Sequence, residues 1–465
     1  MNKTANYGLF IDFGSTFTKL VLIDFHAERI VSRTQSPSTV DTDIMVGLNN
    51  ALGQLRESQG EELTFRHKLA CSSAAGGLRM VTIGLVPELT VEAGKRAALG
   101  AGAKVVGVYS YQLTKKELQD LESIAPDIIL LAGGTDGGDR ETILKNATSL
   151  SHCNLHCPIV VAGNKVASDD IQGILDSGKK EYVITDNVLP EIGVLKVDEV
   201  RSIIREVFIN RIIESKGLKN AEQFVDGILM PTPTAVLTAA RLLSQGTNKE
   251  EGLGELVIVD IGGATTDVHS IGWGKPTESG VVQKGLPEPF VKRTVEGDLG
   301  MRYNASSILQ AVGEDHFRRE LGNSELNVEK QVDQLSHFTD RLPESSTEWR
   351  LDAELARTAV RLAMERHAGS IEPTYGPQGQ ILIQYGKDLK GIRTVIGTGG
   401  PLVFSPAPEN ILEALVFSES NPFSLKPRAP SFYLDQEYLL YAIGLMSEIE
   451  PEKALRVAKK HLRKI

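Results

Sequence analysis

Two aspartates in this chain, Asp12 and Asp260, each end an apolar run and are followed by a turn with small or hydroxyl-bearing side chains. Glycines in such a turn leave backbone N–H groups open to an incoming group, and these groups form a nest suited to phosphate oxygens. A carboxylate beside this nest would repel a bare phosphate. The combination makes chemical sense when Mg²⁺ or a polarised water lies between the two. Both segments therefore predict contact with a magnesium-bound phosphate.

The second of these segments begins with a run from Leu256 to Ile261 that is rich in β-branched residues and uninterrupted. Such a run is typical of a strand buried on both faces. Residues 265–272 then resemble the returning strand of a hairpin. The residues of this turn that we expect to contact phosphate are Gly262, Gly263, Thr265 and Thr266.

The first segment repeats this order near the N-terminus. A strand ends at Asp12, a turn follows, and an alternating strand begins after it. Aligning Asp12 with Asp260 also aligns Gly14 with Gly262. A single Asp-x-Gly arises often by chance, but two copies, each between a strand and a hairpin strand, predict a duplicated phosphate-binding lobe. The expected phosphate contacts of the first copy are Gly14, Ser15, Thr16 and Lys19.

A third element follows the apolar run 392–396 and contains Gly397, Gly399 and Gly400, with a helix expected from about residue 409. A glycine-rich turn between a strand and a helix allows the backbone to approach a flat ligand or a phosphate closely. Its position after the two acidic turns makes it a candidate for contact with adenosine.

Taken in this order, the three elements resemble the actin-like ATPase superfamily of sugar kinases, actin and heat-shock chaperones. Two further segments, 231–240 and 435–445, resemble the connecting helices of the chaperones, and 296–302 occupies the place of a chaperone segment between hairpin and helix. One departure is Ala264, which stands where the chaperones keep a third glycine.

A narrower resemblance covers nearly the whole chain. Segments 71–105, 127–139 and 293–302 resemble the glutamate mutase accessory protein family called MutL or GlmL, which is unrelated to the mismatch-repair protein of the same name. The resemblance implies a reactivating ATPase or chaperone whose partner is an adenosylcobalamin-dependent mutase such as glutamate mutase. It also implies ATP or ADP and Mg²⁺ as cofactors.

Given this resemblance, we expect ATP with Mg²⁺ to bind in a cleft between two lobes. Asp12 would orient Mg²⁺ through water, and Ser15 and Thr16 would hold phosphate oxygens. Asp260 would position and polarise the attacking water, because phosphoryl transfer needs positioning and charge neutralisation more than covalent chemistry. Thr265 would lie by the γ-phosphate. Lys19 would either neutralise phosphate charge or serve only as a strand residue.

The expected fold class is α/β, with a two-lobed actin- or chaperone-like core made of duplicated ribonuclease-H-like lobes. Short apolar strands alternate with helical stretches between residues 61 and 195, which predicts an inserted small parallel α/β domain. The predicted parts are the start of lobe one (1–60), the inserted domain (61–195), a helical return to the hinge (196–250) and lobe two (251–465).

The composition sets outer limits on function. The net charge of −10 and the pI near 5.5 disfavour broad binding to nucleic acid or to anionic membranes. There is no stretch that predicts a signal peptide or a transmembrane helix. Three cysteines in a chain of 465 residues indicate a reducing cytoplasm rather than a disulfide framework.

Several other motifs have a plain structural explanation. Residues 267–272 fit the Asp-x-His-x-x-Gly loop that ligates cobalamin, but His269 is expected on a hairpin strand, which favours coincidence. The His- and Cys-rich segment 152–157 lacks a second cluster of metal ligands, and Cys71 lacks an evident base. The glycine-rich segment 131–139 lacks the lysine of a P-loop, leaving a structural turn or a partner contact open.

Two rival functions remain at this stage. One is a small-molecule kinase built on the same core, which would need a base aimed at a substrate hydroxyl. The other is a scaffold that senses nucleotide without hydrolysing it. The resemblance favours a weak ATPase over both.

Overall fold

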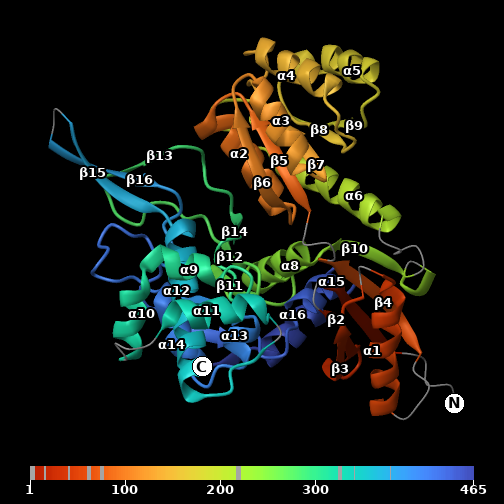
Figure 1. Ribbon diagram of the computed structural model, residues 1–465, viewed down its shortest axis with the longest axis vertical. Helices are drawn as coiled ribbons and strands as arrows, with labels where there is room; N and C mark the ends of the chain where they lie inside the picture. The colour runs from red at the N-terminus through yellow and green to blue at the C-terminus, as the bar shows by residue number, and fades with distance from the viewer. Residues whose placement is uncertain are drawn as a thin grey trace. The chain divides into compact units, whose positions relative to one another are not determined.

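The computed structural model describes residues 6–14, 17–39, 42–59, 64–73, 78–215, 221, 223–322, 327–339, 341–376 and 379–465. Two predicted phosphate ligands, Ser15 and Thr16, lie outside the described residues. The described residues form four β-sheets (Figure 1). They belong to two compact units, one comprising residues 1–239, 285–287 and 440–457, and the other comprising residues 240–284, 288–439 and 458–465.

The first unit contains the sheet of lobe one, with strand order β10-β4-β1-β2-β3. Strand β2 is antiparallel to both of its neighbours, β1 and β3, whereas β4 and β10 run parallel to β1. Helix α1 packs against β2 and β3, and α15 packs against β1 and β4. The bounds are β1 (Tyr7–Phe13), β2 (Phe17–Asp24), β3 (Arg29–Pro37), β4 (Phe65–Ser72), β10 (Gly227–Pro231), α1 (Ile44–Gln59), α8 (Thr232–Gln245) and α15 (Leu440–Ser447).

A second sheet of the first unit has the order β6-β5-β7-β8-β9, and all of its strand pairs are parallel. Helices α2 and α6 share a core with one face, and α3, α4 and α5 share a core with the other. The strands are β5 (Arg79–Gly84), β6 (Lys104–Ser110), β7 (Ile128–Leu131), β8 (Ile159–Val161) and β9 (Tyr182–Ile184). The helices are α2 (Glu92–Gly100), α3 (Lys115–Ile124), α4 (Glu141–His152), α5 (Ser168–Ser177) and α6 (Asp198–Ser215), with short turns at Pro87–Val91 and Lys165–Ala167.

The second unit contains the sheet of lobe two, with order β14-β12-β11-β17-β18-β19. Helix α12 packs against β11, β12 and β14. The strands are β11 (Leu256–Ile261), β12 (Thr266–Ile271), β14 (Val291–Glu296), β17 (Thr394–Thr398), β18 (Ser431–Leu434) and β19 (Arg463–Lys464). The helices are α9 (Ala305–Val312), α10 (Glu314–Leu321), α11 (Val328–His337), α12 (Ser346–His367), α13 (Gly400–Val403), α14 (Pro408–Leu412) with a further turn at Glu413–Leu415, and α16 (Pro451–His461), which crosses from the first unit.

The two lobe sheets have the same topology. In each, an antiparallel meander of three strands is followed by two strands parallel to the first, so that the first five strands have the order 3-2-1-4-5 in both; lobe two adds β19, antiparallel to β18, as a sixth. This is the duplicated ribonuclease-H-like lobe of an actin-like core, and the predicted fold class is confirmed. Both predicted hairpins, β1–β2 and β11–β12, are present.

The domain boundaries expected at residues 60, 195 and 250 remain a prediction. Two strands nevertheless fall outside the expected pattern: β4 follows residue 60 but pairs in the sheet of lobe one, and β10 lies within the segment expected to be helical. The segment between them holds the whole parallel sheet, because β4 and β10 are neighbours in the sheet of lobe one.

A three-stranded sheet of the second unit was not predicted. Its order is β13-β16-β15, with β13 (Val281–Lys284), β15 (Ser370–Gly376) and β16 (Gly379–Tyr385). Figure 1 shows β15 and β16 as a long hairpin. Of the described side chains in these strands only Gln384 is buried, which is why no pattern of alternating burial marks them.

Candidate functional site: two acidic hairpins

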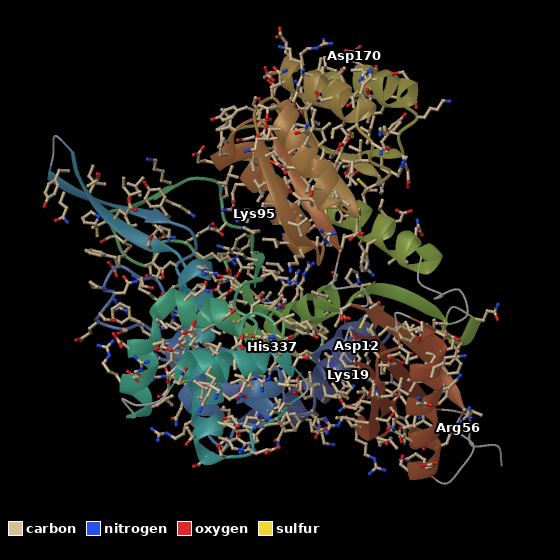
Figure 2. The ribbon with its side chains drawn as sticks, in the orientation of Figure 1. Asp12, Lys19, Arg56, Lys95, Asp170 and His337 are labelled. Carbon is tan, nitrogen blue, oxygen red and sulfur yellow. The ribbon has the colours of Figure 1, made fainter. Side chains whose placement is uncertain are left out.

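Asp12 lies one residue before the end of β1, directly opposite Lys19 on β2. Lys19 Nζ is 3.6 Å from Asp12 Oδ2, and the Asp12 side chain is 4% exposed against 32% for Lys19. Figure 2 shows the two residues close together on this hairpin. The buried carboxylate therefore faces a cation that still reaches solvent.

The carboxylate of Asp12 has two further neighbours, one on the parallel strand β4 and one just after the parallel strand β10. The Thr232 hydroxyl, at the start of α8, donates to Asp12 Oδ1 at 2.6 Å. Cys71, in register with Asp12 on β4, places its Sγ 3.8 Å from the same oxygen. Because the carboxyl ends of parallel strands meet at one sheet edge, these side chains converge there.

Cys71 is fully buried, and this burial, followed by the nearby charge of Asp12, raises the pKa of its thiol well above the ordinary value. A nucleophilic cysteine needs the opposite shift. The structure therefore supports a packing and hydrogen-bonding role for Cys71.

The turn of the first hairpin is closed by the N–H of Gly14, which donates to the carbonyl of Phe17 at 3.1 Å. A Cβ at Gly14 would lie 2.5 Å from that carbonyl oxygen, so only glycine fits without rearrangement. The Ser38 hydroxyl donates to the Gly14 carbonyl at 2.8 Å. The backbone of Gly14 is thus held on both sides of the turn.

In the second hairpin Asp260, on β11, stands opposite Asp267 on β12. Asp267 accepts a hydrogen bond from the Thr265 hydroxyl at 2.9 Å and forms an ion pair with Arg293 of β14, at 2.7 Å. Like charges directly opposite one another destabilise a strand pair, so the guanidinium of Arg293 offsets this repulsion. Thr265, which was expected beside the γ-phosphate, has its hydroxyl directed to Asp267.

The turn of this hairpin has the same closure as the first, since the N–H of Gly262 donates to the carbonyl of Thr265 at 2.9 Å. The N–H groups of Gly263, Ala264 and Thr265 donate to no residue that the structure describes. Gly263 and Ala264 are exposed. Three backbone donors in succession are therefore available at this turn, and the alanine in place of a third glycine does not close it.

The carbonyls of this turn are held from the other side by residues 299–304. The N–H of Met301 donates to the carbonyl of Gly262, and those of Arg302 and Tyr303 donate to the carbonyl of Gly263 at 2.9 and 3.0 Å. Asn304 Nδ2 donates to the carbonyl of Ala264 at 3.0 Å. With every turn carbonyl directed inward, the N–H groups face outward.

This brace is itself anchored by a buried ion pair. Arg302 donates to both carboxylate oxygens of Asp352 on α12, at 2.7 and 3.2 Å, and the two side chains are 11% and 10% exposed. Thr266 is also part of the brace, because its buried hydroxyl donates to the carbonyl of Leu299 at 2.7 Å. The sequence had suggested Thr266 as a phosphate contact, and it singled out neither Arg302 nor Asp352 individually.

The third element meets the second hairpin. A Cβ at Gly399, whose φ is +102°, would lie 2.2 Å from the carbonyl oxygen of Ile261, so this glycine is needed for close backbone approach. A Cβ at Gly397 would meet Leu402 and Leu412 at 2.8 and 3.1 Å. Gly400 is open, with only the Tyr438 hydroxyl within 4 Å of its would-be Cβ. Of the three glycines, Gly400 is the one with room for a ligand.

Two residues beside this element were missed by sequence reasoning. Thr398 is in register with Asp260 on the neighbouring parallel strand, and its hydroxyl donates to Asp435 Oδ2 at 3.3 Å. Asp435 Oδ1 accepts from the N–H of Leu439 at 2.8 Å. Asp435 follows β18 and is 3% exposed, so the carboxyl edge of this sheet carries a buried carboxylate in addition to the half-buried Asp260.

The other candidate motifs take structural roles. His269 is 1% exposed within β12, and burial followed by the charge of Arg293 lowers its pKa to about 3, so it remains neutral. His152 contacts the carbonyl of Thr148 on its own helix, and no group of three metal-ligating side chains occurs among the described residues. The glycine-rich turn after β7 is held by the side chains of Asn164 and Asn187.

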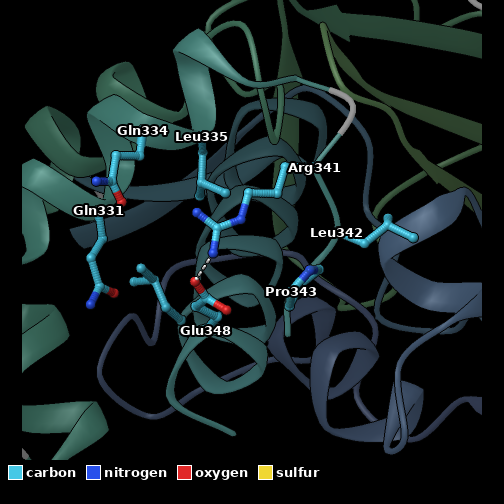
Figure 3. Close-up of a pocket in the computed structure, with 8 residues that line it drawn as sticks. Gln331, Gln334, Leu335, Arg341, Leu342, Pro343 and Glu348 are labelled. Carbon is cyan, nitrogen blue, oxygen red and sulfur yellow. Dashed lines mark hydrogen bonds and ion pairs between the residues drawn. The ribbon is translucent and has the colours of Figure 1, made fainter. Parts of the chain in front are cut away.

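A small cavity of about 60 Å³, lined by Gln331, Arg341, Glu348 and neighbouring residues of α11 and α12, contains none of the predicted site residues (Figure 3).

The sequence matches the family described as MutL protein over residues 8–462. The chain belongs to the MutL family. Protein MutL from Clostridium tetanomorphum is 50% identical over 458 residues, which cover 98% of this chain and 99% of that relative. The resemblance to the MutL family predicted from the sequence is therefore confirmed.

Solved structures similar to this MutL-family chain are distant. The ethanolamine utilization protein EutJ from Carboxydothermus hydrogenoformans has a TM-score of 0.28 and 10% identity, covering 97% of this chain and 89% of its own. Xylulose kinase from Bifidobacterium adolescentis has a TM-score of 0.34 and 10% identity, covering 99% and 96%. A glycerol dehydratase reactivase has a TM-score of 0.34 and 9% identity, covering 95% and 99%. The fold assignment rests on the strand order of the two lobes.

Within the described parts of this MutL-family chain, no helix is both long enough and apolar enough to cross a lipid bilayer. The roles of the individual site residues in binding or catalysis stay predictions.

Proposed function

We propose that this protein binds ATP with Mg²⁺, hydrolyses it, and uses the cycle to reactivate an adenosylcobalamin-dependent mutase, with glutamate mutase as the partner. The observation that carries the proposal is the repeated acidic hairpin. Each copy ends a buried strand in an aspartate and closes its turn with the same hydrogen bond, from Gly14 to Phe17 and from Gly262 to Thr265. Membership of the MutL family and the family resemblance support the mutase as partner.

Phosphate oxygens would be held by backbone donors of the second hairpin. The N–H groups of Gly263, Ala264 and Thr265 supply three donors that no described residue uses, and the brace at residues 299–304 holds them in place. Donors fixed in advance stabilise developing negative charge without reorganisation during the reaction. In the first hairpin, Lys19 supplies a cation that reaches solvent.

The residues present fit a magnesium ion that arrives with the nucleotide. The described residues contain no group of three metal-ligating side chains, so these residues do not by themselves supply a complete metal cage. Mg²⁺ ordinarily keeps several waters and takes one or two carboxylates together with substrate phosphates. Asp12 is the carboxylate for this purpose, because one oxygen is fixed by Thr232 and the other faces Lys19 at 3.6 Å. The ion would neutralise phosphate charge there.

Asp260 would orient the attacking water and accept its proton. It stands at the carboxyl edge of β11, next to Thr398 and the open turn. Phosphoryl transfer depends on such positioning and charge neutralisation. Loss of the γ-phosphate would remove contacts that order the turns, and that change would be passed to the mutase. The proposal keeps the cytoplasmic location expected from the sequence.

The test separates the two aspartates. Nucleotide affinity is measured by calorimetry with and without Mg²⁺, and phosphate release is measured with and without purified glutamate mutase. Asp260→Asn should bind ATP within about threefold of the unsubstituted protein and lose at least about a hundredfold in turnover. Asp12→Asn should lose the magnesium dependence of ATP binding.

A matched control is Asp43→Asn. Asp43 is an exposed carboxylate in the same compact unit as Asp12, and it lies outside both hairpins. It should leave affinity and turnover unchanged. Turnover by Asp260→Asn equal to that of the unsubstituted protein would remove the role assigned to Asp260. No recovery of inactivated glutamate mutase upon addition of this protein, ATP, Mg²⁺ and fresh cofactor would contradict the reactivating function.

A further inference from the structure

The parallel sheet between β4 and β10 has a topology that points to a binding edge. Numbered within itself, its strand order β6-β5-β7-β8-β9 is 2-1-3-4-5, with helices on both faces. In open sheets of this doubly wound kind, ligands bind outside the carboxyl ends of the strands. The loops after β7, β8 and β9 lie at that edge, and none of them takes part in the proposed nucleotide chemistry.

These three loops form one hydrogen-bonded platform with Asp136 at its centre. Asp136 Oδ1 accepts from the N–H of Lys165 at 3.1 Å and from Asn187 Nδ2 at 3.0 Å. The N–H of Asp136 donates to the carbonyl of Pro190 at 2.9 Å. Asn164 accepts from the N–H of Gly137 at 3.1 Å and donates to the carbonyl of Gly138 at 3.2 Å. The internal polar groups of the platform are thus used in holding its own loops together.

The platform exposes apolar side chains instead. Ile192 is 78% exposed, Val166 is 52% exposed and Val194 is 40% exposed. Ile192 stands at the tip of a tight turn in which the N–H of Val194 donates to the carbonyl of Glu191 at 3.0 Å, with Gly193 at φ +85°. Apolar side chains held outward on adjacent rigid loops, with a polar rim, mark a surface that binds another macromolecule.

The charges around this apolar group are mostly negative, although Lys196 on the loop after β9 is also exposed. The cations Arg140 and Lys165 are taken up by ion pairs with Asp170 and Asp136; Figure 2 labels Asp170, on α5. Four exposed carboxylates form no ion pair with any described residue: Asp139, Asp169, Asp186 and Glu191. A partner that complements this surface carries lysine or arginine side chains around an apolar centre, and nucleic acid is disfavoured because its phosphates would be repelled.

We propose that the mutase partner docks on the exposed face of this platform. That face consists of the apolar side chains of Val166, Ile192 and Val194 and the rim carboxylates Asp186 and Glu191. The inference rests on the proposed function, because it assigns the partner as glutamate mutase. It gives the inserted sheet a role in recognition that is separate from the two acidic hairpins.

The test measures binding of purified glutamate mutase holoenzyme to the full-length protein by interferometry at low and high salt. Ile192→Ser removes the exposed apolar tip and should weaken binding at least about tenfold. The double variant Asp186→Lys with Glu191→Lys should slow association and reduce its dependence on salt. Val108→Ser and Asp120→Lys are matched controls, because Val108 is 47% exposed on the edge strand β6 and Asp120 is exposed on α3. Both should stay within about twofold.

Each variant is first checked for an unchanged melting temperature and unchanged ATP affinity, so that a folding defect is recognised as such. Mutase binding that is equally strong in Ile192→Ser and in the unsubstituted protein overturns the docking inference and leaves the proposed function standing. Absence of mutase binding by the unsubstituted protein in every nucleotide state overturns both.

Discussion

At the same register position the first hairpin carries Lys19 and the second carries Asp267. In the first, the charge of Asp12 is balanced from within the hairpin by a lysine that is 32% exposed. In the second, two opposed aspartates are balanced from outside by Arg293, whose side chain is 4% exposed. The same backbone therefore carries a partly exposed cation in one lobe and is balanced by a buried one in the other.

In the second hairpin the described residues also form a brace around the turn. Residues 299–304 hold its turn carbonyls, and Arg302 with Asp352 anchors them. The comparison teaches that duplication conserved the turn while the supporting residues diverged. The difference is consistent with two roles under the proposed function. The first hairpin would neutralise charge on the ligand, and the second would hold its backbone N–H donors in a fixed position.

The largest expected effect comes from the brace. Asp352→Ala leaves the guanidinium of Arg302 buried without its carboxylate, and breaking a buried pair in this way costs about 3–5 kcal/mol. Denaturant unfolding measures the loss, and hydrogen exchange should show faster opening at the N–H groups of residues 301–303, which donate to the turn carbonyls. The exposed pair of Lys145 and Glu141 is the control, because Lys145→Ala should change neither quantity. Equal loosening of the first hairpin would show that the brace is not specific to the second.

The next largest effect is a difference between Arg293 and Lys19 in their contribution to the free energy of unfolding. Arg293→Leu leaves Asp260 and Asp267 opposed without a guanidinium, which should cost about 2–3 kcal/mol in the free energy of unfolding. Lys19→Leu should cost less, because Lys19 is itself 32% exposed and the Asp12 carboxylate keeps its hydrogen bond from Thr232. Calorimetric unfolding distinguishes the two. Adding Asp267→Asn to Arg293→Leu should restore part of the loss, and no recovery would contradict the assigned repulsion.

A smaller effect is expected in the loss of folding stability at acidic pH. His269 occupies the register position that Val21 holds in the first hairpin, and its folded-state pKa of about 3 lies below its unfolded value near 6.5. The unfolded chain therefore binds the proton first, so this contribution to stability is present above pH 6.5 and is lost as pH falls towards 3. His269→Val should flatten the fall in the denaturation midpoint between pH 7 and 5. Part of the slope should remain, because burial also lowers the pKa of His367.

The smallest effect is expected at Gly263. A Cβ there would meet only Arg302 carbons, at 3.7 Å or more, so Gly263→Ala should change the free energy of unfolding by less than about 0.5 kcal/mol. Gly14→Ala should cost more, since its Cβ would lie 2.5 Å from the Phe17 carbonyl. A fall in ATP affinity for Gly263→Ala at unchanged stability would sharpen the assignment of this turn to phosphate. Affinity measured alongside melting temperature decides it.

The sequence was sufficient for the hairpins because their signals are local. The run Leu256–Ile261 is the observed strand β11, and the helical stretches expected at residues 114–124 and 168–178 correspond to α3 and α5. In each hairpin, the apolar run that indicates a buried strand and the Asp and Gly residues that indicate the turn are adjacent in the sequence. A short window is therefore enough to predict both.

The parts that were not predicted depend on contacts distant in the sequence or on surfaces without burial. Strand β10 is five residues long and runs directly into α8, so its pattern merges with that of the helix. The β13-β15-β16 sheet is exposed and gives no alternation. The brace acts through backbone groups of residues 299–304, whose side-chain types do not encode it, and the buried pair of Thr398 and Asp435 joins two separate strands. Ser15 and Thr16 stay predictions because they lie outside the described residues.

The adjacency of β4 and β10 has a kinetic consequence. Residues 73–226 separate these two neighbours, so an unstructured connection of that length would add about 4 kcal/mol of closure entropy to their pairing. The intervening parallel sheet is built from contacts nearer in sequence, which form faster. We therefore expect this parallel sheet to form before β10 pairs with β4, so that the pairing of β10 is the slow step in completing the five-stranded sheet of lobe one.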